Sequence, residues 1–328
     1  MRMLISTWLY LSCMGVSCCP DQGLIRCGAE RTEDYLPLIR NKHIALVANH
    51  TSLVAGTHLV DTLISMGMGK DQLLRVFAPE HGFRGERAAG AQVADGKDPL
   101  TGIAIVSLYG AHRKPEPADL SGVELVVFDL QDVGARFYTY ISTLHYVMEA
   151  CAEQGVPLLV LDRPNPNIGY VDGPIREANF ISFVGKHPIP VVYGLTIGEL
   201  AGMINEEGWL NAGIRCDLQV IPCANYSRHM EYSLPVPPSP NLPNDHAIRL
   251  YPSTCFFEGT VLSEGRGTSM PFEVYGHPDL EGDFSFTPRS IPGVSGDPKF
   301  RDQLCVGADL RDFVPEEGWT RITVLERM

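Results

Sequence analysis

Four short apolar segments in the first half of the chain constrain its fold more than any other feature of the sequence. They cover residues 43–48, 73–78, 124–130 and 157–161, and most of them are rich in Val, Ile and Leu. Apolar runs of this length, without alternating polar residues, are typical of strands buried on both faces of a parallel sheet. We therefore predict a parallel sheet at the core of the protein.

Helix-like segments alternate with these apolar runs. Residues 59–68 follow the first run, residues 138–154 precede the last, and a third segment begins at Thr196 with Glu199 three positions later. The spacing of Thr196 and Glu199 is typical of a capping box at the start of a helix. Alternating strands and helices predict an α/β fold, with a Rossmann-like, doubly wound, mostly parallel sheet in a domain over residues 21–225.

The character of the sequence changes after about residue 225. Residues 234–243 contain five prolines, residues 263–268 form a glycine-rich stretch, and helical periodicity is weak. We therefore predict a second, smaller α+β domain over residues 226–328.

The charge balance restricts the possible partners. The chain has 26 Lys and Arg residues against 39 Asp and Glu residues, which gives a formal net charge of −13. Proteins that bind the phosphates of nucleic acid usually carry a basic face, so no nucleic-acid partner is expected. Beyond the N-terminus no apolar run approaches the roughly 20 residues of a membrane-spanning helix, so no membrane span is expected in the mature protein.

The N-terminus is predicted to be a signal peptide over residues 1–20. Arg2 precedes an uncharged, mildly apolar stretch, and small residues near Gly15 and Ser17 form an exit site. This order is typical of export signals. We expect a periplasmic or extracellular protein, with lipid attachment at Cys18 as the alternative.

Polar and ionisable residues follow each of the four predicted strands, where ligands bind in open α/β sheets. Lys is absent from all four segments, whereas Glu, His, Asp, Arg and Asn recur, and this selection favours a functional cleft over ordinary solvated turns. The segments are Asn49–Thr51, Pro79–Glu86, Asp129–Arg136 and Asp162–Asn167.

The residue types at these strand ends favour sugar hydrolysis. No G-x-G-x-x-G motif follows the first predicted strand and no H-E-x-x-H motif occurs, so a dinucleotide site or a zinc protease is not indicated. Carboxylates with Arg and aromatic neighbours suit glycoside cleavage, because one carboxylic acid protonates the leaving oxygen while a second carboxylate acts as base or nucleophile. A metal-dependent hydrolase that uses His81 and the Asp cluster is the alternative.

Seven segments closely resemble the NamZ family, exo-acting β-N-acetylmuramidases of bacterial peptidoglycan turnover that were long catalogued as a domain of unknown function. The resemblance implies a Rossmann-like domain and a smaller domain with the active site in the cleft between them. It also implies removal of terminal non-reducing N-acetylmuramic acid from peptidoglycan fragments such as MurNAc-GlcNAc, with no cofactor and no metal. The segments are FAPEHGFRGE (Phe77–Glu86), SLYG (Ser107–Gly110), FDLQDVGARFYTYISTL (Phe128–Leu144), LDRPNPN (Leu161–Asn167), GLTIGELA (Gly194–Ala201), PPSPNLP (Pro237–Pro243) and EGTVLSEGRGTSMPFEVYG (Glu258–Gly276).

The resemblance suggests catalytic roles for particular residues. The favoured catalytic acid of the family matches Glu80 in the string PEHG. Glu264 is the first candidate for the second carboxylate, and Asp132 and Glu86 compete with it.

The substrate implied by the resemblance suggests further contacts. Muramic acid differs from glucosamine by a lactyl carboxylate, which a guanidinium binds well through two parallel hydrogen bonds. The candidates for this clamp are Arg84, Arg136, Arg163 and Arg266. The other predicted substrate contacts are His81, Glu86, Gln131, Tyr138, Asn165 and Asn241.

The resemblance weakens after Pro315, and the family normally continues for several tens of residues past Met328. It therefore implies that the smaller domain is shortened at its C-terminus. If this shortening disables the cleft, the alternative is that the chain is a non-catalytic muropeptide-binding protein. The sequence makes no prediction of the oligomeric state.

Overall fold

The computed structural model describes residues 23–80, 82–84 and 95–313, so the predicted signal peptide lies outside the described residues. At its centre lies a seven-stranded sheet in the order β5-β6-β4-β1-β7-β8-β9. Neighbouring strands run parallel, except that β5 pairs antiparallel with β6. The strands are β1 (Ile44–Ala48), β4 (Leu73–Ala78), β5 (Gly96–Lys97), β6 (Ala104–Ser107), β7 (Leu125–Asp129), β8 (Leu158–Leu161) and β9 (Leu218–Ile221).

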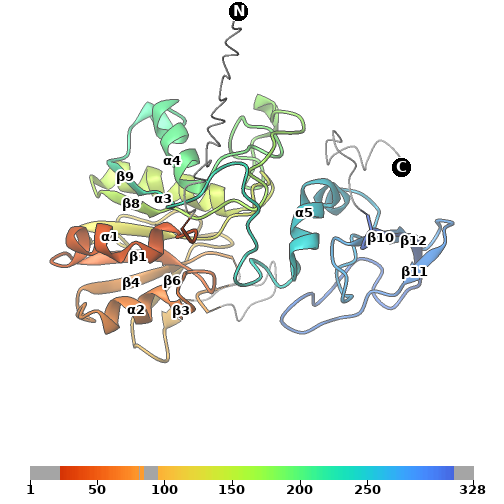
Figure 1. Cartoon of the computed structure of the whole chain (residues 1–328), viewed down its shortest axis with the longest axis horizontal. Helices are drawn as coiled ribbons and strands as arrows, with labels where there is room; N and C mark the ends of the chain where they lie inside the picture. The colour runs from red at the N-terminus through yellow and green to blue at the C-terminus, as the bar shows by residue number, and fades with distance from the viewer. Residues whose placement is uncertain (1–22, 81, 85–94, 314–328) are drawn as a thin grey trace, which may run out of the picture.

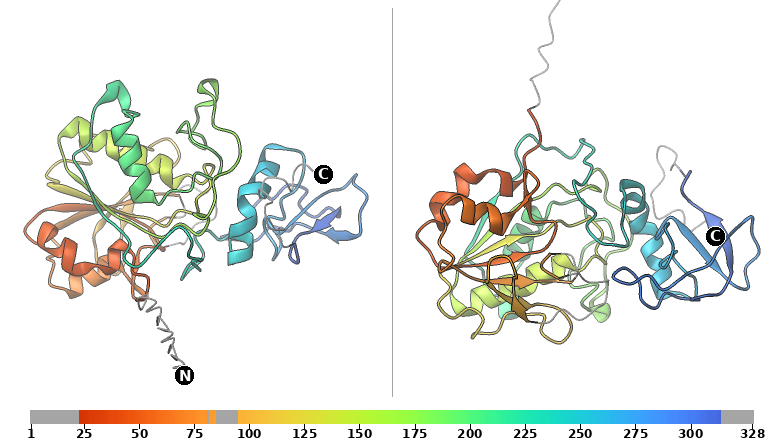
Figure 2. Two further views of the ribbon diagram at one scale, coloured as in Figure 1. Left: turned by 45° about the horizontal axis from the view of Figure 1, so that its top comes forward. Right: turned by 90° about the horizontal axis from the view of Figure 1, so that it is seen from below.

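Helices cover both faces of this sheet, as Figures 1 and 2 show. Successive residues of a strand point to opposite faces, and β1 is buried along its whole length. Leu46 packs in the same cluster as residues of α1 (Thr32–Ile39) and α2 (Leu59–Ser65). Val47 packs instead with residues of α3 (Tyr140–Gln154) and α4 (Ile197–Glu206). The doubly wound α/β prediction is therefore confirmed.

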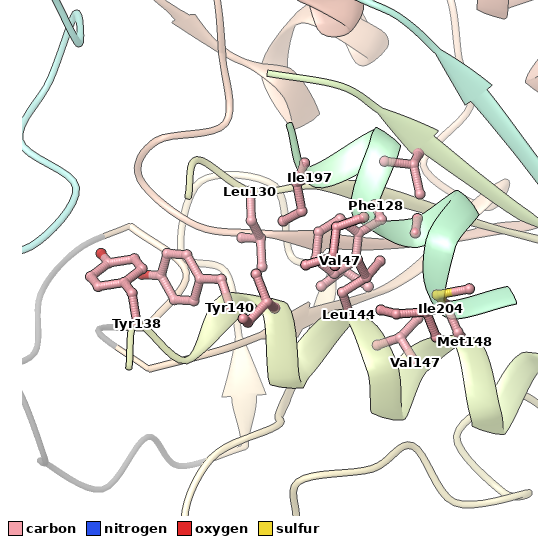
Figure 3. Packing of buried hydrophobic residues seen from close by; sticks show 14 of the residues in the cluster. Val47, Phe128, Leu130, Tyr138, Tyr140, Leu144, Val147, Met148, Ile197 and Ile204 are labelled. Atoms are coloured by element: carbon pink, nitrogen blue, oxygen red, sulfur yellow. The ribbon is translucent and has the colours of Figure 1, made fainter. Parts of the chain in front are cut away.

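The core on the α3 and α4 side is continuous and apolar. Figure 3 shows Val47 and Phe128 of the sheet beside Leu144 of α3 and Ile204 of α4. All four side chains are fully buried. Burying one such side chain contributes roughly 1.5–3 kcal/mol, so this layer fixes the strand ends that carry polar residues.

The predicted strands and helices occur where the apolar pattern indicated. The four apolar runs become β1, β4, β7 and β8, and the three helical segments become α2, α3 and α4. The capping box forms as predicted: the backbone N–H of Glu199 donates to the Thr196 hydroxyl at 3.2 Å, and the Thr196 N–H donates to the Glu199 carboxylate at 2.9 Å.

Several elements of this domain were not predicted, among them β6, β9 and α1. β6 and β9 are short strands near the two edges of the sheet, and most of their residues are only partly buried. Their apolar signal is therefore weak. α1 contains Pro37, a residue that usually argues against a helix interior.

The chain after residue 244 forms a smaller lobe beside the sheet domain (Figure 1). It contains α5 (Asp245–Thr254), the 3-10 helix η4 (Cys255–Gly259) and an antiparallel sheet in the order β10-β12-β11. Its strands are β10 (Val274–His277), β11 (Phe284–Phe286) and β12 (Cys305–Asp309). The α+β character of this part matches the prediction, and the boundary at residues 225 and 226 stays a prediction.

A small two-stranded sheet lies outside the central sheet. The strands β2 (Leu53–Val54) and β3 (Thr57–His58) form a small hairpin after β1. Among residues 23–80, 82–84 and 95–313, no helix is both long enough and apolar enough to cross a membrane.

Candidate active site

The carboxyl ends of β4, β1, β7 and β8 lie along one edge of the sheet, because these strands are parallel neighbours. Glu80 follows the end of β4 by two residues, and the segment between β7 and α3 carries Phe137 to Tyr140. The prediction that these strand ends meet is confirmed by the pairing. This edge is where open α/β sheets bind their ligands.

A cavity of about 430 Å³ lies at this edge. Residues of the sheet domain and of the smaller lobe both line it. Its volume is within the range of small-molecule sites. The lining residues of the described chain are Glu80, Tyr109, Arg113, Phe137, Tyr138, Thr139, Tyr140, Ser182, Phe183, Val184, Ser239, Leu242, Tyr251, Glu258, Arg266 and Phe272.

The Glu80 carboxylate is held by hydrogen bonds from two hydroxyl groups. The Tyr109 hydroxyl donates to Oε1 at 3.1 Å, and the Thr139 hydroxyl donates to Oε2 at 3.2 Å. The Tyr140 hydroxyl donates to the Glu80 backbone carbonyl at 3.4 Å and accepts from the Asn49 side-chain amide at 2.6 Å. Glu80 is only half-buried, so its carboxyl group is oriented and still reaches the cavity.

Tyr109 remains a hydrogen-bond donor over the whole physiological pH range. Burial and the negative charge of Glu80 raise the pKa of Tyr109 to about 12. The neutral hydroxyl therefore persists beside the carboxylate. A donor in this place fixes the rotamer of Glu80 without adding a charge to the cavity.

The smaller lobe brings an ion-paired cluster to the opposite wall. The Arg266 guanidinium donates to the Glu258 carboxylate and lies 3.2 Å from Glu264. Lys299 approaches the other oxygen of Glu264 at 3.5 Å. Glu258 and Arg266 line the cavity, whereas Glu264 is buried behind them and does not line it.

Aromatic side chains form the apolar part of the cavity wall. Tyr138 and Tyr140 lie edge to face at the start of α3, with ring centroids 4.8 Å apart (Figure 3). The Tyr138 hydroxyl donates to the Pro238 carbonyl at 2.7 Å. Phe137 and Phe272 add two further rings. A wall that combines rings with carboxylates suits a ligand that has both apolar and hydroxylated surface, such as a sugar.

Asp132, a predicted catalytic candidate, lies in the core and does not line the cavity. Its carboxylate accepts hydrogen bonds from the Tyr193 hydroxyl and, at 2.6 Å, from the Gly134 backbone N–H. Burial raises the pKa of Asp132 to about 6. The side chain therefore shapes the turn after β7 and is not part of the cavity lining.

Three of the four predicted carboxylate-binding arginines point elsewhere. Arg163 forms a buried, two-pronged ion pair with Asp129, in which Nη2 donates at 2.9 Å. Arg84 pairs with Asp61 at 3.0 Å and with Asp98 at 2.8 Å. Neither lines the cavity.

Arg136, the third of these arginines, lies in a neighbouring cavity of about 350 Å³. Its guanidinium donates to the backbone carbonyls of Pro174 and Ile189. Burial and the nearby charge of Arg176 lower the pKa of Arg136. Of the four arginines, only Arg266 lines the cavity that contains Glu80.

The predicted amide contacts are also structural. Gln131 donates to the carbonyls of Asp132 and Pro164, Asn165 donates to the Leu195 carbonyl, and Asn241 donates to the Val294 carbonyl. All three side chains are at least 97% buried. These contacts hold backbone segments in place, and none of the three side chains lines the cavity.

His81 and Glu86 lie outside the described residues, so the structure assigns them no position. Within the described chain, no group of three or more His, Cys, Asp or Glu side chains is arranged to hold a metal ion. The Asp cluster at the strand ends is dispersed among separate partners: Asp129 binds Arg163, and Asp162 accepts from the Thr196 hydroxyl at 2.8 Å.

Tyr109, Arg113, Thr139 and Glu258 are among the lining residues that the sequence analysis did not single out. Tyr109 belongs to the string SLYG and Glu258 begins the string EGTVLSEGRG, so each stood inside a segment of family resemblance. Arg113 lies in no such string. Only the three-dimensional approach of the loop after β6 to the edge of the sheet reveals it.

The comparison with protein families decides the relationship. The model described as exo-beta-N-acetylmuramidase NamZ, N-terminal, matches residues 44–246. The chain belongs to the NamZ family. The C-terminal NamZ model matches residues 249–323, a little beyond Pro315, so the NamZ match includes both the sheet domain and the smaller lobe.

Individual relatives agree with the NamZ assignment. The peptidoglycan beta-N-acetylmuramidase NamZ of Bacillus subtilis (strain 168) is 42% identical over 271 residues, which cover 80% of this chain and 64% of that protein. The chain thus spans somewhat less than two thirds of the length of that curated relative.

Two solved structures of DUF1343 family proteins from Bacteroides fragilis have the same fold. One is 47% identical, with a TM-score of 0.81, and the match covers 90% of this chain and 78% of the other. The second is 29% identical, with a TM-score of 0.78, covering 92% and 80% of the two chains.

Proposed function

We propose that the chain is an exo-β-N-acetylmuramidase, a glycoside hydrolase that removes the terminal N-acetylmuramic acid from the non-reducing end of peptidoglycan fragments such as MurNAc-GlcNAc. The observation that carries the proposal is the position of Glu80, held by two hydroxyl donors in a cavity that also contains Glu258. The printed activity of the 42% identical relative supports the same chemistry.

Glu80 is proposed as the general acid. Its carboxyl proton passes to the glycosidic oxygen while the bond from that oxygen to the anomeric carbon breaks. Water supplies the new hydroxyl at the anomeric carbon, and its second proton restores the carboxyl group. The products are free N-acetylmuramic acid and the shortened glycan. Tyr109 and Thr139 position the acid for this transfer.

Glu258 is proposed as the second carboxylate. It lines the same cavity as Glu80, and its ion pair with Arg266 fixes its position there. Glu264, the first candidate from the sequence, contacts Arg266 from behind and is proposed as a positioning residue. Asp132 has no route to the cavity through its own contacts.

A chromogenic β-N-acetylmuraminide tests this proposal. The wild-type protein is expected to release the chromophore, and Glu80→Gln is expected to lose activity by about 10²–10⁴-fold. Glu206→Gln is the matched control, because Glu206 is an exposed carboxylate of α4 that pairs with Arg215 and does not line the cavity. Equal activity in wild type and Glu80→Gln contradicts the role of Glu80.

The same assay separates the alternatives. Binding of the muraminide by wild type without turnover favours a muropeptide-binding protein. Loss of activity with a chelator favours a metal-dependent hydrolase. We expect turnover that a chelator leaves unchanged.

Export belongs to the proposal, because cell-wall glycan lies outside the cytoplasmic membrane. The predicted signal peptide at residues 1–20 would direct the protein to the periplasm or the medium, and lipid attachment at Cys18 is the alternative. Cell fractionation tests this. We expect the protein in the periplasm or medium, or in the membrane fraction if it is lipidated, and retention in the cytoplasm contradicts export.

A further inference from the structure

The cavity that contains Glu80 is lined by two cationic side chains of the described chain, Arg113 and Arg266. Arg266 is paired with Glu258 and Glu264, so its positive charge is balanced within the protein. The other predicted arginines lie outside this cavity. Arg113 is therefore the residue whose charge has to be explained.

Arg113 differs from the basic residues on either side of it. His112 lies 3.0 Å from Asp119, and Lys114 lies 2.6 Å from Glu149 and 2.7 Å from Glu153. Arg113 has no carboxylate within ion-pair distance among the residues that the structure describes. It is exposed to solvent in the cavity. A guanidinium that lines a ligand-sized cavity and forms no ion pair with a described carboxylate is suited to bind an anionic group of the ligand.

The Arg113 guanidinium is held in place by an aromatic ring. Its central carbon lies 4.4 Å from the centroid of Phe183, within the distance of a cation–π contact. The Phe183 ring also stacks on Tyr146, with centroids 6.3 Å apart and planes 15° apart, and its backbone carbonyl accepts from Ser142 at 2.6 Å. Contact with the face of a ring orients the guanidinium and leaves its edge, where the N–H groups lie, available to a ligand.

Arg113 is also close to the catalytic end of the cavity. Its charge acts to lower the pKa of the Tyr109 hydroxyl, the group that donates to Glu80, although burial and Glu80 raise that pKa overall. Arg113 and Glu80 line the same cavity, so a sugar unit whose glycosidic oxygen lies at Glu80 could also present an anionic group to Arg113.

We propose that Arg113, supported by Phe183, binds the lactyl carboxylate of the muramyl unit and determines the preference for muramic acid over glucosamine. This inference rests on the proposed function and names the specificity residue of that site. The planar fork of Arg matches a carboxylate through two parallel hydrogen bonds. An unsubstituted N-acetylglucosaminide lacks that group and leaves Arg113 without a partner.

The test compares three chromogenic substrates: the muraminide, the same muraminide with its lactyl carboxylate converted to a neutral amide, and the glucosaminide. For Arg113→Gln we expect kcat/KM on the muraminide to fall about 10- to 100-fold, mainly through KM, with less than a threefold change on the neutral amide. Arg113→Lys should recover part of the loss, since it restores the charge without the fork. Arg215→Gln, which changes an exposed cation that pairs with Glu206 and does not line the cavity, is the control and should behave as wild type.

Two results would overturn the inference: an unchanged preference in Arg113→Gln, or an equal loss on the charged and neutral muraminides. If wild type cleaves none of the substrates, the proposed function fails, and calorimetry with free N-acetylmuramic acid then decides the inference. Weaker binding by Arg113→Gln, at least tenfold, supports it, and equal binding contradicts it.

Discussion

The hydroxyl group of Tyr109 donates a hydrogen bond of 3.1 Å to Oε1 of Glu80, and this contact joins the loop after β6 to the end of β4. Both strands are neighbours in the sheet, so a residue that follows one of them positions a residue that follows the other. The second oxygen of Glu80 is held by Thr139, which precedes α3. Two separate segments thus orient a carboxyl group that a third segment carries.

Tyr109→Phe is expected to lower kcat about tenfold, because the hydrogen bond that positions the Glu80 carboxyl group contributes roughly 0.5–1.5 kcal/mol. KM should change less, since Tyr109 acts on Glu80 and its effect on ground-state binding is indirect. Steady-state kinetics on the muraminide measure both constants. Tyr275→Phe is the control, because Tyr275 does not line the cavity. A rise in KM at constant kcat would show that Tyr109 contacts the sugar.

Glu258→Gln and Glu264→Gln are expected to differ in kind. Glu258→Gln should lower kcat by about 10²-fold or more at nearly unchanged stability, as expected for a carboxylate that takes part in glycoside cleavage. Glu264→Gln should reduce stability by about 1–3 kcal/mol, because the change removes a buried partner of Arg266, and its effect on kcat should be smaller. Kinetics and urea denaturation of both variants test this. The reverse pattern would return the second catalytic role to Glu264.

Asp132 gives the protein a pH-dependent stability. Its pKa is raised from 3.8 to about 6 by burial, so the folded state retains a proton that the unfolded state releases. The free energy of unfolding should therefore fall as the pH rises from about 4 to 6 and then level off. One pKa unit corresponds to about 1.4 kcal/mol, so this contribution reaches about 3 kcal/mol.

Asp132→Asn removes this titration. Relative to wild type, the variant should gain stability progressively between pH 4 and pH 6, by an amount that stays constant above pH 6. Urea denaturation at each pH measures the difference. A difference that is the same at pH 4 and pH 7 would show that Asp132 has an ordinary pKa.

Arg163→Gln is expected to destabilise the fold by about 3–5 kcal/mol, because it leaves Asp129 charged and unpaired in the core. A double change to apolar residues of similar size, Arg163→Met with Asp129→Leu, should cost much less. Chemical denaturation tests both variants. If Arg163→Gln keeps full stability and raises KM for the muraminide, Arg163 binds substrate as the sequence suggested.

The sheet domain was predictable because its central strands β1, β7 and β8 consist almost entirely of apolar residues. β1 and β7 are completely buried, and such runs have few other uses in a chain of this composition. α5 was harder to predict, since Pro252 lies within it and its start depends on one contact, in which the backbone N–H of Ala247 donates to Asn244 at 2.8 Å. The weak helical periodicity of this segment therefore gave no indication of α5.

The site was predictable only in part, for a physical reason. Glu80 follows a strand directly, so its position at the edge of the sheet could be inferred from the sequence. The arginines near the strand ends are equally plausible carboxylate-binding residues in the sequence. In the folded chain, however, Arg163 forms an ion pair with Asp129 and Arg84 forms one with Asp98. Whether a charge is paired depends on contacts between distant residues. The availability of Arg113 to a ligand also depends on such contacts, so the residues around it in the sequence do not reveal it.

The most direct test of the central claim is product analysis on the trisaccharide MurNAc-GlcNAc-MurNAc. The account predicts that wild type releases free N-acetylmuramic acid and the disaccharide GlcNAc-MurNAc, which mass spectrometry identifies after labelling of the reducing end, and that Glu80→Gln releases neither. Cleavage of the linkage next to the reducing end, which gives MurNAc-GlcNAc, would contradict the account. Equal product release by Glu80→Gln would also contradict it.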